Sequence, residues 1–189
     1  MIALNPRTTA LVLIDLQNGI INRPLEPRDG QVVAEAGMAL AERFRAAKAL
    51  VVPVHVCWAK DYADMPSMNV DQPMPRPEGG MPADFATFHP GLVRDGDLII
   101  SKHQWGALYG TELDAQLRRR GVKTIVLGGI ATNFGVESTA RQGWEHGYDV
   151  VICEDLCTSQ SDHLHRLSVQ HILPRISRVI QSAELHFTA

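Results

Sequence analysis

The chain has 189 residues, of which 45% are hydrophobic, and its 18 basic and 21 acidic residues give a formal net charge of −3. This length and hydrophobic share predict a single globular domain over residues 1–189 and exclude a disordered chain. The charges are balanced and form no long runs, so neither nucleic acid nor an anionic membrane surface is expected as a partner. A small-molecule substrate or another protein is the expected partner.

The compartment is suggested by the start of the chain and by its cysteines. Met1 is not followed by a basic, long apolar leader, and the apolar runs have the length of strands, so we expect neither a signal peptide nor a membrane span. Cys57, Cys153 and Cys157 form an odd set without a paired framework, which fits a reducing compartment. We therefore expect a cytoplasmic protein.

In the first half of the chain, strand-like and helix-like segments alternate. Residues 10–14 are a continuous aliphatic run, as expected of a parallel strand covered on both faces. Apolar residues at helical spacing predict a helix over residues 31–49, and residues 50–56 predict a second strand. Residues 60–90 hold most of the prolines and methionines, and a loop of that length is usually a lid or an interface segment.

The second half continues this alternation. The strands predicted there are residues 97–101, 124–127, 149–153 and 177–180. The helices predicted there are one capped by Thr111 and closed by Gly121, and two over residues 133–146 and 162–173. Six strands with intervening helices predict an α/β protein, a three-layer α/β/α sandwich with a six-stranded, mainly parallel, Rossmann-like sheet.

Two charged residues end aliphatic strands, where ligands bind in sheets of this kind. Asp15 ends the first strand and Lys102 the third. A carboxylate against an apolar wall is costly unless it is paired, so Asp15 should have a shifted pKa or a neighbouring cation such as Lys102. Such a couple can hold a carboxyl group ready for proton transfer. Taken singly, Asp15 fits a turn cap equally well, and Lys102 fits a lysine that snorkels into water.

Residues 128–136 pass from a strand straight into a helix, which directs backbone N–H groups and the positive end of the helix dipole at the cleft. Gly135 has no side chain and would let a ligand oxygen or a water approach this turn closely. Arg141 is interpreted as a structural residue. The helix that follows is expected to bury Val136, Ala140 and Trp144 and to expose a ladder of Glu137, Arg141 and Glu145.

Three stretches of the chain carry a family resemblance. ALVLIDLQN (10–18), LIISKHQWGALYGTEL (98–113) and VLGGIATNFGVESTAR (126–141) resemble the isochorismatase-like hydrolase superfamily, which includes nicotinamidases, other cysteine amidases and the isochorismatases. The spacing matches along almost the whole chain. The resemblance implies the same α/β/α fold.

The same resemblance implies working residues. Most members of the superfamily use an aspartate, a lysine and a cysteine; Asp15 and Lys102 match the first two, and Gly135 stands at the third position. The resemblance therefore places this chain in a branch that lacks the nucleophilic cysteine. It also implies a non-proline cis peptide at Ile130–Ala131, with the N–H groups of Ala131 and residue 135 forming an oxyanion site.

The resemblance also raises the question of a metal. Nicotinamidases of the superfamily carry a site of Asp and His residues after the second strand, but residues 57–62 contain no closely spaced histidine pair. His163 and His165 are two apart on a predicted helix, so they should point to different faces. We expect no metal and no other cofactor.

The glycine at position 135 changes the chemistry that is expected. Without a thiol there, no acyl-enzyme can form in the usual way. Isochorismatases share this glycine and hydrolyse a vinyl ether, in which a carboxylic acid protonates the vinyl carbon and water attacks the oxocarbenium ion. By that resemblance Asp15 is the general acid, Lys102 orients it and binds the substrate's carboxylate, and the Ala131 and Gly135 amides hold the water or a substrate oxygen.

The walls of the pocket are suggested by residues near these motifs. Trp105 and Tyr109 would line the pocket, although both suit a core or an interface equally well. Thr132 and Asn133 stand where the isochorismatases have an aromatic residue and a histidine. The candidate substrate-binding cations, Lys60 and Arg76, lie in the long 60–90 segment.

The functional alternatives come from different classes. The first is a hydrolase of a small anionic metabolite that uses Asp15 and Lys102, and the second is an inactive homologue that binds or regulates. The third is an amidase with a relocated nucleophile, although Cys57 better fits a small buried hydrophobe and Thr132 a helix cap. The resemblance also implies a homodimer or homotetramer.

Overall fold

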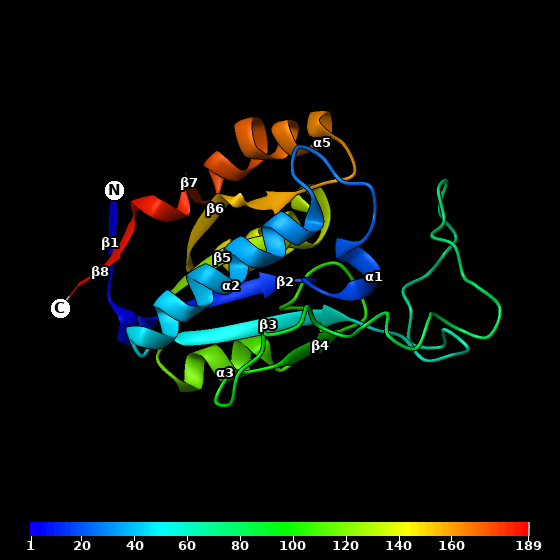
Figure 1. Ribbon diagram of the computed structural model, residues 1–189, viewed down its shortest axis with the longest axis horizontal. Coiled ribbons are helices and arrows are strands. Elements are labelled where there is room, and N and C mark those ends of the chain that lie inside the picture. Colours follow the sequence, from blue (N-terminus) through cyan, green and yellow to red (C-terminus); the bar gives the residue numbers. More distant parts are fainter. Residues whose placement is uncertain (189) are drawn as a thin grey trace.

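A six-stranded sheet, parallel throughout, forms the centre of the computed structural model, which describes residues 1–188 (Figure 1). The strand order is β4-β3-β2-β5-β6-β7, so the order reverses between β2 and β5. Ala189, the last residue of the predicted domain, lies outside the described residues. The strands are β2 (Thr9–Ile14), β3 (Leu50–Val56), β4 (Ile100–Lys102), β5 (Thr124–Ile130), β6 (Asp149–Thr158) and β7 (Arg178–Ile180).

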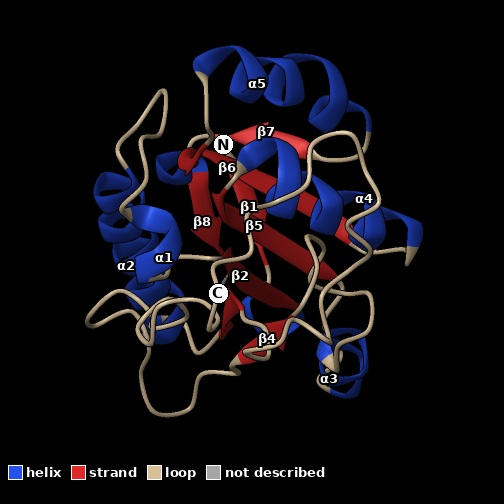
Figure 2. Cartoon of the chain, turned by 90° about the vertical axis from the view of Figure 1, so that its right-hand side faces the viewer, coloured by secondary structure: helices blue, strands red, loops and turns tan. Residues whose placement is uncertain are grey.

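Helices cover both faces of this sheet (Figure 2). Along β2, Leu11 and Leu13 pack into the core on the side of α2, while Val12 and Ile14 pack into the core on the opposite side. All six residues of β2 are buried between these two cores, which explains the continuous aliphatic sequence of this strand. The predicted α/β sandwich is confirmed. The helices are α1 (Asn18–Ile21), α2 (Gly30–Ala46), α3 (Leu113–Arg119), α4 (Glu137–Glu145) and α5 (Asp162–Leu167).

Several predicted boundaries differ from those observed. The strand expected at residues 97–101 begins at Ile100, because the Asp97 carboxylate is held in a turn by Arg45 and the Arg94 N–H. The helix expected over residues 133–146 begins with a π-type turn, Thr132–Val136. Similarly, α5 passes into a second π-type turn at Ser168–Ile172.

The predicted buried stripe on α4 is partly wrong. Val136 and Ala140 are fully buried, but Trp144 is 54% exposed, and Gly143 faces the core instead. A Cβ at position 143 would lie 2.6 Å from Ile125 Cδ1, so this part of the helix packs too closely for a larger side chain. Of the predicted exposed ladder of Glu137, Arg141 and Glu145, one rung is present, with Arg141 Nη2 2.9 Å from Glu137 Oε1, but Glu137 is half-buried.

A second, two-stranded sheet was missed in the sequence. The strands β1 (Ile2–Leu4) and β8 (Leu185–Phe187) pair in parallel and bring the two ends of the described chain together (Figure 1). Each strand has three residues, too few to show a periodic pattern.

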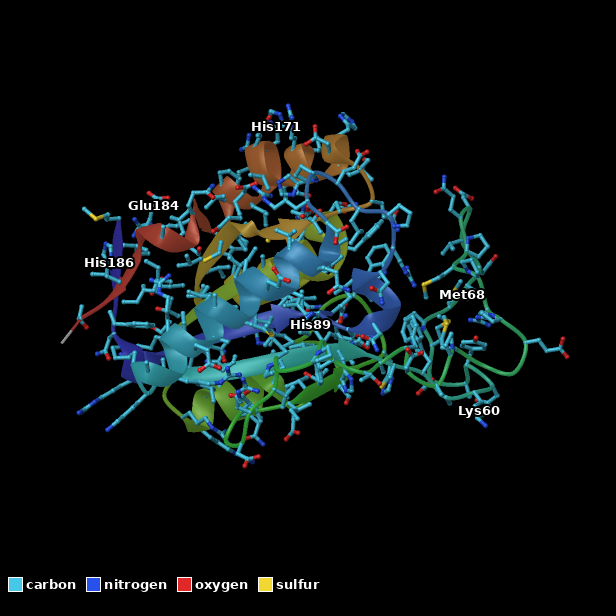
Figure 3. The ribbon with its side chains drawn as sticks, in the orientation of Figure 1. Lys60, Met68, His89, His171, Glu184 and His186 are labelled. Carbon is cyan, nitrogen blue, oxygen red and sulfur yellow. The ribbon has the colours of Figure 1, made fainter. Side chains whose placement is uncertain are left out.

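The long segment between β3 and β4 extends away from the sheet, and Lys60 and Met68 lie on its extended part (Figure 3). Near its return it is attached beside the end of β2 by a bridge between Gln17 and Phe88. The buried Gln17 amide also donates to the carbonyl oxygens of Val56 and Phe85, at 2.9 and 3.0 Å. Across residues 1–188, no helix is long and apolar enough to cross a membrane.

Candidate active site

Asp15 lies directly after β2, at the point where the strand order reverses. Its backbone N–H donates to the Val54 carbonyl at 2.9 Å, while its φ of 54° is in the left-handed region. This conformation is uncommon for residues other than glycine and occurs often at functional sites, although aspartate tolerates it better than most. The bend turns the Asp15 side chain into a buried position, with 6% of the residue exposed.

Lys102 reaches this carboxyl group from the end of β4, with β3 between the two strands. Its Nζ donates to Asp15 Oδ2 at 2.7 Å and to the Gln104 carbonyl at 3.1 Å. Lys102 is 1% exposed, so it does not snorkel into water. The sequence-based expectation that the two strand ends converge is confirmed.

The two carboxyl oxygens of Asp15 have different surroundings. Oδ2 accepts the Lys102 hydrogen bond, whereas Oδ1 is buried without a hydrogen-bond partner. Burial raises the pKa of Asp15, and this effect exceeds the opposing effect of the Lys102 charge and hydrogen bond. A neutral carboxyl group with Oδ2 held by Lys102 would therefore carry its proton on Oδ1, free to be donated.

The turn after β5 packs against Asp15. Near the end of β5, Gly129 has a φ of 128°, and a Cβ there would lie 2.1 Å from the Ile14 carbonyl oxygen, so only glycine fits. The peptide bond that ends β5, Ile130–Ala131, is cis. Further along, a Cβ on Gly135 would lie 3.4 Å from Asp15 Oδ2 and 2.8 Å from Ile14 Cγ2. A side chain at position 135 would therefore displace Ile14 and lie in van der Waals contact with the carboxyl group.

Thr132 does not cap the helix, contrary to the prediction. The turn has no side-chain cap, and the Thr132 hydroxyl instead donates to the Thr158 carbonyl at 3.0 Å. The same oxygen lies 2.8 Å from Nδ1 of the buried His165. A cap requires an extended residue just outside the helix, and that position belongs to Ala131.

Of the two aromatic residues expected in the pocket wall, one lies at the site. The Trp105 ring packs on the Phe134 ring with 4.6 Å between centroids, and the Trp105 carbonyl oxygen would be 3.4 Å from a Cβ on Gly135. Tyr109 is 73% exposed, and its backbone is held by Gln104 and Gln142. Trp105 therefore borders the turn, while Tyr109 projects outward.

Cys57 is half-buried, where a fully buried side chain was expected. Its backbone N–H donates to the Lys102 carbonyl at 3.1 Å, so Cys57 lies beside the end of β4. Burial and the charge of Asp64 raise the pKa of the Cys57 thiol, which disfavours the nucleophilic thiolate. Burial also raises the pKa of the Cys153 and Cys157 thiols.

Arg23 is a candidate that was missed in the sequence. It follows α1, and its Nε donates to the Gly19 carbonyl at 2.7 Å. Arg23 is exposed; partial desolvation lowers its pKa, and the charge of Asp15 opposes this. The loop that carries it is tied to the end of β6 by a bridge between Glu26 and Ser159. The only signal in the sequence was an arginine shortly after the first strand.

The other predicted ligand residues are dispersed. Lys60 lies on the extended part of the 60–90 segment (Figure 3), and the Arg76 guanidinium stacks 5.8 Å above the Tyr62 ring. His163 is exposed, whereas His165 is buried, so the two point apart as expected. Within the described part of the chain, no three His, Cys, Asp or Glu side chains are grouped to hold a metal ion.

Comparison with known proteins finds a matching family model and similar proteins. Residues 9–184 match a family model described as the isochorismatase domain. The chain is 46% identical over 187 residues to YecD, an uncharacterized isochorismatase family protein of Escherichia coli O157:H7, with 98% of each chain covered. It is 32% identical over 195 residues to the ureidoacrylate amidohydrolase RutB of Methylobacterium radiotolerans, covering 90% of this chain and 75% of that one.

A solved structure gives the same result. The isochorismatase family protein from Burkholderia thailandensis superposes with a TM-score of 0.91 at 42% identity, covering 97% of this chain and 95% of that one. The sheet order, the strand-end residues and these matches agree. The chain therefore belongs to the isochorismatase family and is a hydrolase of that family.

Proposed function

We propose that this protein hydrolyses a small anionic metabolite by acid catalysis at Asp15, without a cysteine nucleophile. The reaction is the hydrolysis of a vinyl ether of the isochorismate type, and no cofactor takes part. The observation that carries the proposal is the buried, unpartnered Oδ1 of Asp15, on a carboxyl group whose pKa is raised by burial. General acids are poised in this way.

The steps can be written on the atoms of this site. The Asp15 carboxyl donates its proton from Oδ1 to the terminal vinyl carbon, which leaves an oxocarbenium ion and a carboxylate. Lys102, 2.7 Å from Oδ2, stabilises the carboxylate formed in this step. A water attacks the oxocarbenium carbon and returns a proton to Asp15. The resulting hemiketal then breaks its C–O bond to release pyruvate and an alcohol.

Gly135 has a positive role in this scheme. A cysteine there would bring its Cβ to 3.4 Å from Asp15 Oδ2, in the space that the substrate needs. The glycine keeps this space open and can still offer its backbone N–H. Together with the Ala131 N–H, it holds the attacking water or a substrate oxygen.

The anionic character of the substrate rests on the cations around Asp15. Lys102 is already bonded to Asp15, whereas the Arg23 guanidinium has no carboxylate within ion-pair distance among residues 1–188. We assign its nitrogens to bind a carboxylate of the substrate.

Replacement of Arg23 tests this assignment. Arg23→Gln should raise KM about tenfold and change kcat little, because the contact forms in the ground state and is kept in the transition state. Arg119→Gln, an exposed arginine on α3, is the matched control and should leave both constants unchanged. A lowered kcat with an unchanged KM would reject a role in substrate binding.

Two alternative functions can be distinguished from this one by simple assays. RutB is named an amidohydrolase, so an amidase with Cys57 as a relocated nucleophile is one of them. Inactivation by iodoacetamide in step with Cys57 labelling would favour that function; the raised pKa of the thiol predicts insensitivity instead. Tight binding of a metabolite without any product would favour an inactive binding homologue.

Pyruvate release from isochorismate, followed with a lactate dehydrogenase couple, tests the proposed reaction. We expect release by the wild-type chain and none by Asp15→Asn. Equal release by both proteins would reject Asp15 as the acid. Absence of release by the wild type would reject this substrate.

We also propose that the chain acts as a homodimer or homotetramer in the cytoplasm. Light scattering at micromolar concentration tests the assembly, and a monomeric mass would reject it.

A further inference from the structure

A second buried polar cluster lies behind the turn that carries Gly135. At its centre is His165 of α5, which is 2% exposed. Its Nε2 lies 2.9 Å from Glu154 Oε1, and its Nδ1 lies 2.8 Å from Thr132 Oγ1. His165 therefore links a carboxylate on β6 to the first residue of the turn.

The direction of the Thr132 hydroxyl bears on the protonation of the His165 ring. The Thr132 hydroxyl donates its one proton to the Thr158 carbonyl at 3.0 Å, so toward Nδ1 it can only accept. Nε2 faces an oxygen of Glu154, and an ionised carboxylate only accepts as well. With the Thr132 hydroxyl directed at the Thr158 carbonyl, both ring nitrogens of His165 carry protons, and this arrangement is part of the proposal below.

Arg28 and Gln181, which contact Glu154 on the side away from Thr132, favour its ionised form. Arg28 Nη2 donates to both carboxylate oxygens of Glu154, at 2.8 and 3.0 Å, and Gln181 Nε2 donates at 2.8 Å. Burial acts to raise the pKa of Glu154, but the hydrogen bonds from Gln181, His165 and Arg28 outweigh it and hold the pKa below its ordinary value. The carboxylate is thus a firm anchor for the imidazolium.

On the side of the cluster opposite Glu154, His165 contacts Thr132, the first residue of the turn. Thr132 is fully buried and directly follows Ala131, whose carbonyl accepts the N–H groups of Phe134 and Val136 at 3.1 and 3.2 Å. The position of Thr132 therefore influences the directions of the Ala131 and Gly135 peptide groups. Neither His165 nor Glu154 takes part in the proposed reaction.

We propose that His165 is a positioning residue: as a doubly protonated ring anchored on Glu154, it holds Thr132 and thereby the turn that presents Gly135 to Asp15. The importance of this turn for catalysis rests on the proposed function. The positioning itself does not, and it can be tested without any substrate.

Hydrogen exchange at the amides of Phe134 and Val136 reports on the turn. His165→Phe and Thr132→Val should each speed exchange there by about tenfold or more, as expected when a buried hydrogen bond is lost. Thr132→Ser keeps the hydroxyl and should restore slow exchange. His163→Phe changes an exposed histidine on the same helix and should have no effect.

The ¹⁵N spectrum of the His165 ring in the unaltered protein is an independent measurement, so the proposal stays testable even if His165→Phe does not fold. We expect both ring nitrogens to show imidazolium shifts at neutral pH, and we expect Glu154→Gln to remove this signature. A neutral tautomer in the wild type would overturn the proposal. So would unchanged exchange at Phe134 and Val136 in Thr132→Val, which would leave His165 as a packing residue only.

Discussion

Two carboxyl groups, each beside a basic side chain, flank the same turn, and they differ in how completely they are bonded. Asp15 has one oxygen bonded to Lys102 and one oxygen without a partner. Glu154 has both oxygens bonded, by Arg28, His165 and Gln181. The pKa is raised by burial in Asp15 and lowered by the hydrogen bonds in Glu154.

The contrast separates a reactive carboxyl group from a structural one. A carboxyl group with an unpartnered buried oxygen tends to keep its proton and can donate it, whereas one saturated with donors stays ionised and fixes its neighbours. The two residues differ both in burial and in the number of donors around them, because Asp15 is buried beside a single donor and Glu154 is half-buried among three.

The largest effect is expected on turnover. Asp15→Asn keeps an acceptor for Lys102 but removes the transferable proton, so we expect the rate of pyruvate release to fall about a hundredfold to ten-thousandfold. The melting temperature should change little, because the amide fills the same space. Steady-state kinetics and thermal unfolding measure the two effects, and a folded variant with wild-type turnover would remove the distinction between the two carboxyl groups.

Glu154→Gln should have the complementary effect, on stability. The change leaves Arg28 and His165 without their counter-ion, and breaking a pair of this kind costs about 2–3 kcal/mol where the partners are partly exposed. Denaturant unfolding measures this change. A loss of turnover larger than that of Asp15→Asn at unchanged stability would reverse the assignment of the two residues.

A smaller effect is expected from closing the space above Asp15. Gly135→Ala places a methyl group 3.4 Å from Asp15 Oδ2 and should lower kcat/KM about tenfold, as expected when a reacting group is misplaced. Gly143→Ala is the matched control, because its Cβ also meets an isoleucine, at 2.6 Å, but on a part of α4 that does not touch Asp15. Equal losses of activity in both variants would indicate general repacking instead.

The smallest expected effect is on the pH dependence of stability, which should have opposite signs for Asp15 and Glu154. The raised pKa of Asp15 contributes stability below its ordinary value of 3.8, and this is lost as pH rises through the folded-state pKa. The lowered pKa of Glu154 contributes stability above its ordinary value of 4.5, and this is lost as pH falls through the folded-state pKa. The stability of the wild type relative to Asp15→Asn should therefore decline with rising pH, and that relative to Glu154→Gln should increase. Unfolding series from acidic to neutral pH measure both slopes; parallel slopes would contradict the comparison.

The sequence predicted the reactive pair but not the structural one. Asp15 and Lys102 each follow an aliphatic strand, and parallel strands bring such ends to one edge of a sheet. His165 and Glu154 meet only because β6 continues to Thr158, beyond the predicted end at residue 153. The register of β6 against β5 shifts between Leu127 and Gly129, and no pattern in the sequence marks this irregularity.

Other predictions failed for local reasons. Trp144 has the spacing of a buried residue, but Gly143 packs so closely on β5 that the helix turns the tryptophan outward. Thr132 is a residue type that commonly caps helices, but the cap position falls on Ala131 and the Thr132 hydroxyl bonds to the Thr158 carbonyl and His165 instead. In both cases a tertiary contact overrode the local preference.

The protonation of Asp15 is the central claim, and titration of its carboxyl carbon by ¹³C NMR, with Asp15→Asn to assign the signal, tests it most directly. A folded-state pKa above 3.8 is the predicted result, because burial outweighs the charge of Lys102. A pKa at or below that value would show that Lys102 keeps Asp15 ionised, and it would contradict acid catalysis at this site.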